Sequence, residues 1–157
     1  MSFFLWNSQL RQGDIFQDVI SQDRSLVVSI EPLGTDAVKD GLRVTALRCN
    51  DSVILYEIIP TGAQNEFGKK RYNDTVRVND FAFVYQSVQG DQLTPIGELQ
   101  RGETVIVFSA RKLLGYVPKE GNRCVLLDGK KYQVDGVDSH LYPGCFKVLT
   151  SPDQRVE

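Results

Sequence analysis

The stretch from Arg123 to Thr150, RCVLLDGKKYQVDGVDSHLYPGCFKVLT, predicts a β-hairpin followed by a returning strand. Two runs of β-forming residues, CVLL and KYQV, flank the dipeptide Asp128-Gly129. Asp-Gly is favoured at the two central positions of a type I′ turn, because both positions need positive φ angles. We therefore expect a hairpin that is closed by a two-residue turn.

The strand after this turn alternates in polarity. Apolar and polar side chains follow one another from Tyr132 to Asp135, and Phe146 and Val148 repeat the pattern further on. Successive side chains of a strand point to opposite faces of the sheet. The alternation therefore indicates a sheet with one face on a core and one face in water.

The rest of the chain contains further strand signals that turns separate. Apolar, β-forming runs cover residues 25–30, 42–49, 52–59, 74–86 and 103–109. About seven to nine short strands at such spacing are typical of a sandwich or barrel. A chain of 157 residues is long enough to bury a core in one domain. We expect an all-β fold, a small β-barrel or sandwich with long loops and one or two short helices, in a single domain over residues 1–157.

Composition and charge exclude several classes of protein. Apolar residues make up 41% and charged residues 24%, which is ordinary for a globular domain and argues against a disordered or fibrous chain. The net charge is -2 and no long basic tract occurs, so the sequence lacks the footprint of a strong nucleic-acid binder. No apolar run approaches the roughly 20 residues that span a bilayer, and FFLW at the N-terminus lacks the flank of a signal peptide. We expect no membrane association and an intracellular site of synthesis.

Three cysteines, Cys49, Cys124 and Cys145, form an odd set without a C-x-x-C pair. This number and spacing disfavour a disulfide framework and a zinc site. Free cysteine is among the most buried residue types. We expect three reduced thiols, most of them buried.

Residues Thr61 to Asn73, TGAQNEFGKKRYN, predict an exposed loop of unusual length after a break at Pro60. Three adjacent basic residues and two aromatic ones lie in it, as in proteins that stack single-stranded nucleic acid on aromatic side chains. A long polar loop with an aromatic residue also suits ordering on a partner protein. The plain alternative is a solvated loop tip. The predicted partner-binding residues are Gln64, Phe67, Lys69, Lys70, Arg71 and Tyr72.

The N-terminal segment, residues 1–24, allows two interpretations. Gly13-Asp14 is a helix-capping signal, and Ile15, Phe16, Val19 and Ile20 would share one face of a short helix. The apolar residues Phe3, Phe4, Leu5 and Trp6 either tuck onto the chain's own core or form an arm that contacts a neighbouring subunit.

Catalytic and metal-binding patterns are sparse. His140 is the single histidine, so any triad depends on it. Cys145 with His140 and Asp138 is a chemically reasonable nucleophile, base and orienter, and Asp135, Asp138 and His140 are candidate metal ligands, although carboxylates beside turns are more often solvated caps. No glycine-rich phosphate loop occurs. We expect no catalytic residue, no cofactor and no metal.

The C-terminal half resembles the head-closure or head-tail connector proteins of tailed bacteriophages. The similar pattern is V-x-x-D-G-x-x-Y-x-V-x-G-V-D followed by a final short strand. Here it consists of Leu126-Leu127, Asp128-Gly129, Lys130-Lys131, Tyr132, Val134, Gly136, Val137 and Asp138, and it ends at residues Phe146 to Leu149. The runs RVNDFAFVYQ and RGETVIVFS are compatible with the barrel strands of that family, whereas the first 60 residues are not matched.

This resemblance implies a compact β-barrel that assembles as a ring in the virion neck. Its partners would be further copies of itself, portal or adaptor proteins and tail proteins, around a DNA channel that is not read for sequence. Such a ring needs no catalytic residue, and a mildly acidic chain suits a lumen through which DNA slides. The alternative is a free-standing β-barrel module that binds nucleic acid or protein.

Overall fold

A computed structural model of the chain describes residues 2–5, 9–35, 38–64, 66, 68, 70–87 and 104–155, with only the backbone described for residues 2–5, 34–35 and 38–40. The fold is all-β, as the sequence predicts. Two sheets account for the ten strands, and the one helical element within the described ranges is a single 3₁₀ turn, η1, at Arg111–Leu113.

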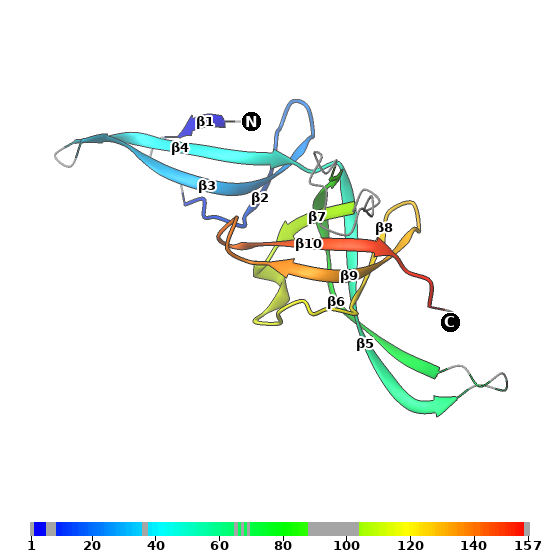
Figure 1. Ribbon diagram of the computed structural model, residues 1–157. Helices are drawn as coiled ribbons and strands as arrows, with labels where there is room; N and C mark the ends of the chain where they lie inside the picture. The colour runs from blue at the N-terminus through cyan, green and yellow to red at the C-terminus, as the bar shows by residue number, and fades with distance from the viewer. Residues whose placement is uncertain are drawn as a thin grey trace, which may run out of the picture.

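The N-terminal sheet has four antiparallel strands in the order β1-β4-β3-β2 (Figure 1). Their bounds are β1 Ser2–Leu5, β2 Ile15–Gln17, β3 Arg24–Thr35 and β4 Val38–Arg48. The remaining six strands close a barrel in the order β10-β7-β6-β5-β8-β9. They are β5 Asp51–Gln64, β6 Lys70–Gln86, β7 Thr104–Ser109, β8 Arg123–Leu126, β9 Lys131–Asp138 and β10 Cys145–Pro152. Of the two predicted architectures, a barrel or a sandwich, the structure has the barrel.

Strand β7 is buried on both faces and joins the two sheets. Ile106 and Phe108 point into the barrel core, whereas Val105 and Val107 pack on the outside against Leu26 of β3 and its neighbours. This explains why its sequence, TVIVFS, is a continuous apolar run instead of an alternating one. We call this cluster outside the barrel, around Leu26, Val105 and Val107, the second core. It gives the N-terminal sheet a fixed place on the barrel wall.

The hairpin at Asp128-Gly129 is confirmed, but the two-residue type I′ turn is wrong. The Gly129 amide donates to the carbonyl of Leu126, and the Leu126 amide donates to the carbonyl of Lys130. Gly129 has a φ of 80°, and Asp128 is not among the described residues with positive φ. This is a three-residue connection, a type I turn that ends on a left-handed glycine. Leu127 is the additional loop residue, and its side chain is 81% exposed.

The short helix expected after Gly13-Asp14 is also wrong, because residues 15–17 form β2. Ile15 pairs with Leu26, and the amides of Gly13 and Val27 extend the ladder through bonds to Val27 and Asp14. Packing of Ile15 against the second core therefore outweighs the helical spacing of its neighbours.

Candidate functional site

The predicted loop from Thr61 to Asn73 is largely strand. Strand β5 runs on to Gln64 and β6 begins at Lys70, with Pro60 paired to Tyr72 and Gln64 to Lys70. The register of the β5–β6 pair is irregular between Pro60 and Gln64. This irregularity accommodates the glycine and proline that suggested a loop. The predicted break at Pro60 is therefore wrong. The residues Gln64, Lys70, Arg71 and Tyr72 lie on this ribbon, and Phe67 and Lys69 lie outside the described residues.

The outer part of β5 and β6, residues 56–64 and 70–76, forms a two-stranded ribbon below the barrel (Figure 1). Strand β8 pairs with β5 only over residues 53–56, and β7 pairs with β6 only over residues 82–86. Beyond these limits the described strands leave both edges of the ribbon without a neighbour. Free edges are surfaces to which another chain can add.

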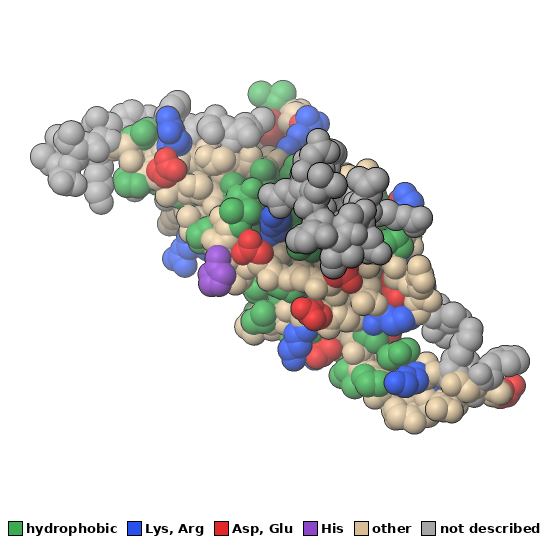
Figure 2. Space-filling view, viewed as in Figure 1, with side chains coloured by type: hydrophobic (Ala, Val, Ile, Leu, Met, Phe, Trp, Pro, Cys, Tyr) green, Lys and Arg blue, Asp and Glu red, His purple; other side chains and the backbone are tan. Residues whose placement is uncertain are grey.

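One face of this ribbon is mainly apolar. Residues that oppose one another in an antiparallel pair point to the same side, and Tyr56 opposes Val76 while Pro60 opposes Tyr72. With Ile58, which lies between them along β5, they form what we call the ribbon face. Asp74, which opposes Ile58, lies on the same side and forms an ion pair with Arg123. Val76 is 55% exposed, and the other four are half-buried or exposed. Figure 2 shows hydrophobic and basic side chains side by side over this end of the molecule.

The basic residues of the ribbon are divided between its two faces. Lys70 follows the alternation of β6 onto the side of Tyr72, whereas Arg71 points to the opposite side. Within the part of the chain that the structure describes, neither forms an ion pair with a carboxylate. Two neighbouring charges do have partners: Asp74 forms an ion pair with Arg123, and Arg77 forms one with Glu57.

The predicted arm residues Phe3, Phe4 and Leu5 form strand β1, which pairs with β4 of the same chain. Phe3 opposes Val44 and Leu5 opposes Leu42. The backbone thus follows the interpretation in which the segment docks on its own molecule. Trp6 lies outside the described residues.

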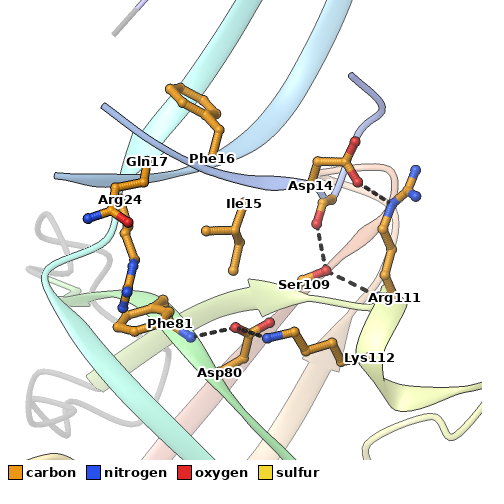
Figure 3. A pocket seen from close by; sticks show the side chains of 11 residues that line it. Asp14, Ile15, Phe16, Gln17, Arg24, Asp80, Phe81, Ser109, Arg111 and Lys112 are labelled. Carbon is orange, nitrogen blue, oxygen red and sulfur yellow. Dashed lines mark hydrogen bonds and ion pairs between the residues drawn. The ribbon is translucent and has the colours of Figure 1, made fainter. Parts of the chain in front are cut away.

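A pocket of about 370 Å³ lies at the seam between the N-terminal sheet and the barrel (Figure 3). At its base is Asp80, whose side chain is 1% exposed. Its Oδ1 accepts from Lys112 Nζ at 2.8 Å and from the Phe81 amide at 2.9 Å, while Oδ2 is buried without a hydrogen-bond partner among the described residues. On the far side, the Arg24 guanidinium lies 3.7 Å from the centre of the Phe81 ring. The pocket is therefore lined by charged side chains of both signs beside apolar ones such as Ile15 and Phe16.

Replacing Lys112 with alanine should lower the free energy of unfolding by roughly 2 kcal/mol, because a buried carboxylate then loses its charged donor. The measurement is urea unfolding at neutral pH. Lys119→Ala, at another exposed lysine, is the control and should cost well under 1 kcal/mol. Equal stability of the two variants would show that water already solvates Asp80.

The arrangement of Cys145 does not favour a nucleophile. Its thiol is 2% exposed and its Sγ donates to the carbonyl of Val27 at 3.7 Å. Burial raises the pKa of Cys145 to about 12, and it raises those of Cys124 to about 12 and Cys49 to about 11. A thiolate is the reactive form. The expected free, mostly buried thiols are confirmed, and His140, the proposed base, is exposed.

The carboxylate of Asp138 caps a turn. Its Oδ1 accepts from the amides of His140 at 2.8 Å and Leu141 at 3.2 Å, and these bonds lower the pKa of Asp138. Over the described residues, no three histidine, cysteine or acidic side chains gather closely enough to hold a metal ion. Asp135, Asp138 and His140 therefore do not form a candidate metal site.

The structure also shows an exposed apolar feature that the sequence interpretation missed. Val19 and Ile20, which were expected on the buried face of a helix, are 86% and 95% exposed in the turn between β2 and β3. The helical spacing of these residues concealed the turn. The acidic residues that flank them, Asp18 and Asp23, are the sequence signal that could have indicated it.

Comparison with known proteins gives no assignment. No protein-family model matches this sequence, and no curated protein is significantly similar to it. In the described part of the chain, no helix has the length and apolar character that a membrane crossing needs.

Proposed function

We propose that this protein is a non-enzymatic structural component of a phage virion neck, where copies form a ring that joins portal or adaptor proteins to the tail around the DNA channel. The observation that carries the proposal is the ribbon of β5 and β6. It extends beyond the barrel with an apolar face and two free edges.

A two-stranded ribbon is marginally stable by itself in water. Here Val76 and Ile59 remain about half exposed, on opposite faces of the ribbon. Contact with another protein would remove this apolar surface from water. Each Å² removed would stabilise the contact by roughly 25 cal/mol. An assembly role therefore accounts for a feature that an isolated barrel does not need.

The chemistry of the described residues agrees with a role that needs no catalysis. The three thiols have raised pKa values, and the single histidine is exposed. A net charge of -2 suits a channel wall that does not retain DNA. The resemblance of the segment 126–149 to connector proteins supplies the specific location in the neck.

The proposal is tested by the mass of the purified protein, alone and mixed with the portal, adaptor and tail proteins encoded beside it. Sedimentation should reveal a cyclic oligomer in at least one of these mixtures. Tyr72→Asp, on the ribbon face, should abolish the oligomer and leave the melting temperature of the barrel within about 2 °C. Leu141→Asp, at a 52% exposed position away from the ribbon, is the matched control.

A strictly monomeric protein in every mixture would refute the neck assignment. The alternative, a free-standing nucleic-acid module, then predicts binding to single-stranded DNA that weakens with salt. The separation of Lys70 and Arg71 onto opposite faces argues against a concentrated phosphate-binding surface. We therefore expect this protein to bind single-stranded DNA only weakly, and we expect substitution of Lys70 or of Arg71 to leave that affinity unchanged.

A further inference from the structure

The turn between β2 and β3 presents two aliphatic side chains in a rigid frame. Asp18 Oδ1 accepts from the amides of Ile20 at 2.7 Å and Ser21 at 2.8 Å, and the Gln22 amide donates to the Asp18 carbonyl at 2.9 Å. The side chain of Gln17 braces Gln22 with bonds of 3.1 and 2.7 Å. We call residues 18–22 the Asp18 turn. A rigid turn loses little conformational freedom on binding, so its apolar tip is pre-organised for contact.

The charge of this turn is negative. Hydrogen bonds from the Ser21 and Ile20 amides lower the pKa of Asp18, so its carboxylate is ionised at neutral pH. Asp23 is compensated by Arg48 at 2.8 Å, whereas no basic residue among those that the structure describes forms an ion pair with Asp18, beside Val19 and Ile20. The turn is thus an apolar tip with one acidic flank.

The ribbon face has the complementary character. Tyr56, Ile58, Pro60, Tyr72 and Val76 supply apolar surface, and Lys70 on the same side supplies a positive charge that no described carboxylate compensates. Asp74 also lies on this side, but Arg123 neutralises its charge through an ion pair of 2.7 Å. In Figure 1 the turn between β2 and β3 lies above the barrel and the ribbon lies below it. One molecule therefore presents the two complementary surfaces on opposite sides.

We propose that the Asp18 turn of one copy docks on the ribbon face of the next copy, with Val19 and Ile20 against the apolar side chains and Asp18 near Lys70. The contact joins two different surfaces of the same chain, so it repeats from copy to copy and closes into a ring where the rotation allows. This inference rests on the proposed self-assembly and specifies the interface that forms it.

The first test compares two double variants whose wild-type side chains are equally exposed. Val19→Ser with Ile20→Ser should weaken self-association roughly 30-fold or more, as loss of a central apolar contact does. Leu114→Ser with Leu127→Ser, at positions 94% and 81% exposed, should leave association unchanged. Sedimentation over a range of protein concentrations measures both, with and without the neck partners.

The second test identifies the contact by position. Ile20→Cys mixed with Val76→Cys should yield a disulfide-linked dimer under mild oxidation, and the chain that carries both changes should yield a ladder of covalent oligomers. Leu127→Cys mixed with Val76→Cys is the control and should remain unlinked.

The outcomes separate this interface from the proposed function. An oligomer that survives the Val19 and Ile20 changes, or that links no better than the control mixture, would overturn the interface and leave the ring intact. A wild-type protein that remains monomeric with and without the neck partners would overturn the proposed function, and the interface with it.

Discussion

Gly13→Ala and Gly144→Ala should each lower the free energy of unfolding by about 3 kcal/mol or more, since each adds a methyl group where two backbones touch. A Cβ at Gly13 would lie 2.2 Å from the carbonyl oxygen of Gly144, and a Cβ at Gly144 would lie 2.5 Å from the carbonyl oxygen of Gln12. Both glycines also have positive φ, 84° and 79°. Strain and collision therefore act together.

This contact holds the N-terminal sheet to the barrel. Ser109 Oγ donates to the Gly13 carbonyl at 2.6 Å, and the Ala110 amide donates to the Gly144 carbonyl at 3.0 Å. An alanine at position 13 would push directly against the latter carbonyl. We expect faster hydrogen exchange at the Ala110 amide than in the wild type.

Denaturant unfolding measures the loss, with Gly115→Ala and Gly121→Ala as controls. Their φ angles are 90° and 84°, but a Cβ at either position would meet no atom within 4 Å. They should cost only the roughly 1–2 kcal/mol of left-handed backbone. If all four variants lose the same stability, the close approach of the two backbones contributes nothing.

Arg123→Met should cost about 3–5 kcal/mol, because it leaves buried carboxylate charge without its partner. The Arg123 side chain is 4% exposed and donates to Asp153 at 2.7 Å and to Asp74 at 2.7 Å. It thereby joins the first residue of β8 to the chain after β10 and to the ribbon. Arg155 also donates to Asp153, at 2.8 Å, and retains part of the network in the variant.

The control for Arg123→Met is Arg77→Met. It removes the ion pair with Glu57, and the Arg77 side chain is 38% exposed. That change should cost about 1 kcal/mol or less. A similar loss in both variants would mean that burial of Arg123 does not matter.

Acid unfolding gives a second measurement of the Arg123 network. Burial alone would raise the pKa of Asp153, but hydrogen bonds from Arg155 and Arg123 outweigh it and hold this pKa well below its ordinary range. The unfolded pKa is about 3.9. Because the folded pKa of Asp153 lies below the unfolded one, its carboxylate stabilises the fold at pH values above the unfolded pKa. This contribution is lost as the pH falls below about 4. Arg123→Met should make stability less dependent on pH in this range.

Local patterns in the sequence were enough to predict the class of fold. The alternation around Tyr132 and Val134 and the apolar run of β7 each depend on a few adjacent residues, and both appear in the structure as barrel strands. The burial of the cysteines also follows from the residue type alone. These features persist because side-chain period and hydrophobicity are properties of the chain itself.

Tertiary pairing decided the features that bear most on the proposed function. Pro60 and the glycines near it are turn signals in isolation, yet pairing of β5 with β6 extends the sheet through them to Gln64. Likewise, Ile15 joins a strand because Leu26 and the outer face of β7 are available to cover it, which leaves Val19 and Ile20 in water.

The sequence by itself thus determined an all-β chain with a hairpin at Asp128-Gly129. Only the tertiary structure decided that the chain closes into a barrel and that an apolar ribbon and an acidic, apolar turn lie on opposite sides of it. The physical reason is that hydrogen bonds between strands and the burial of side chains depend on partners distant in the chain, and local spacing contains no information about those partners.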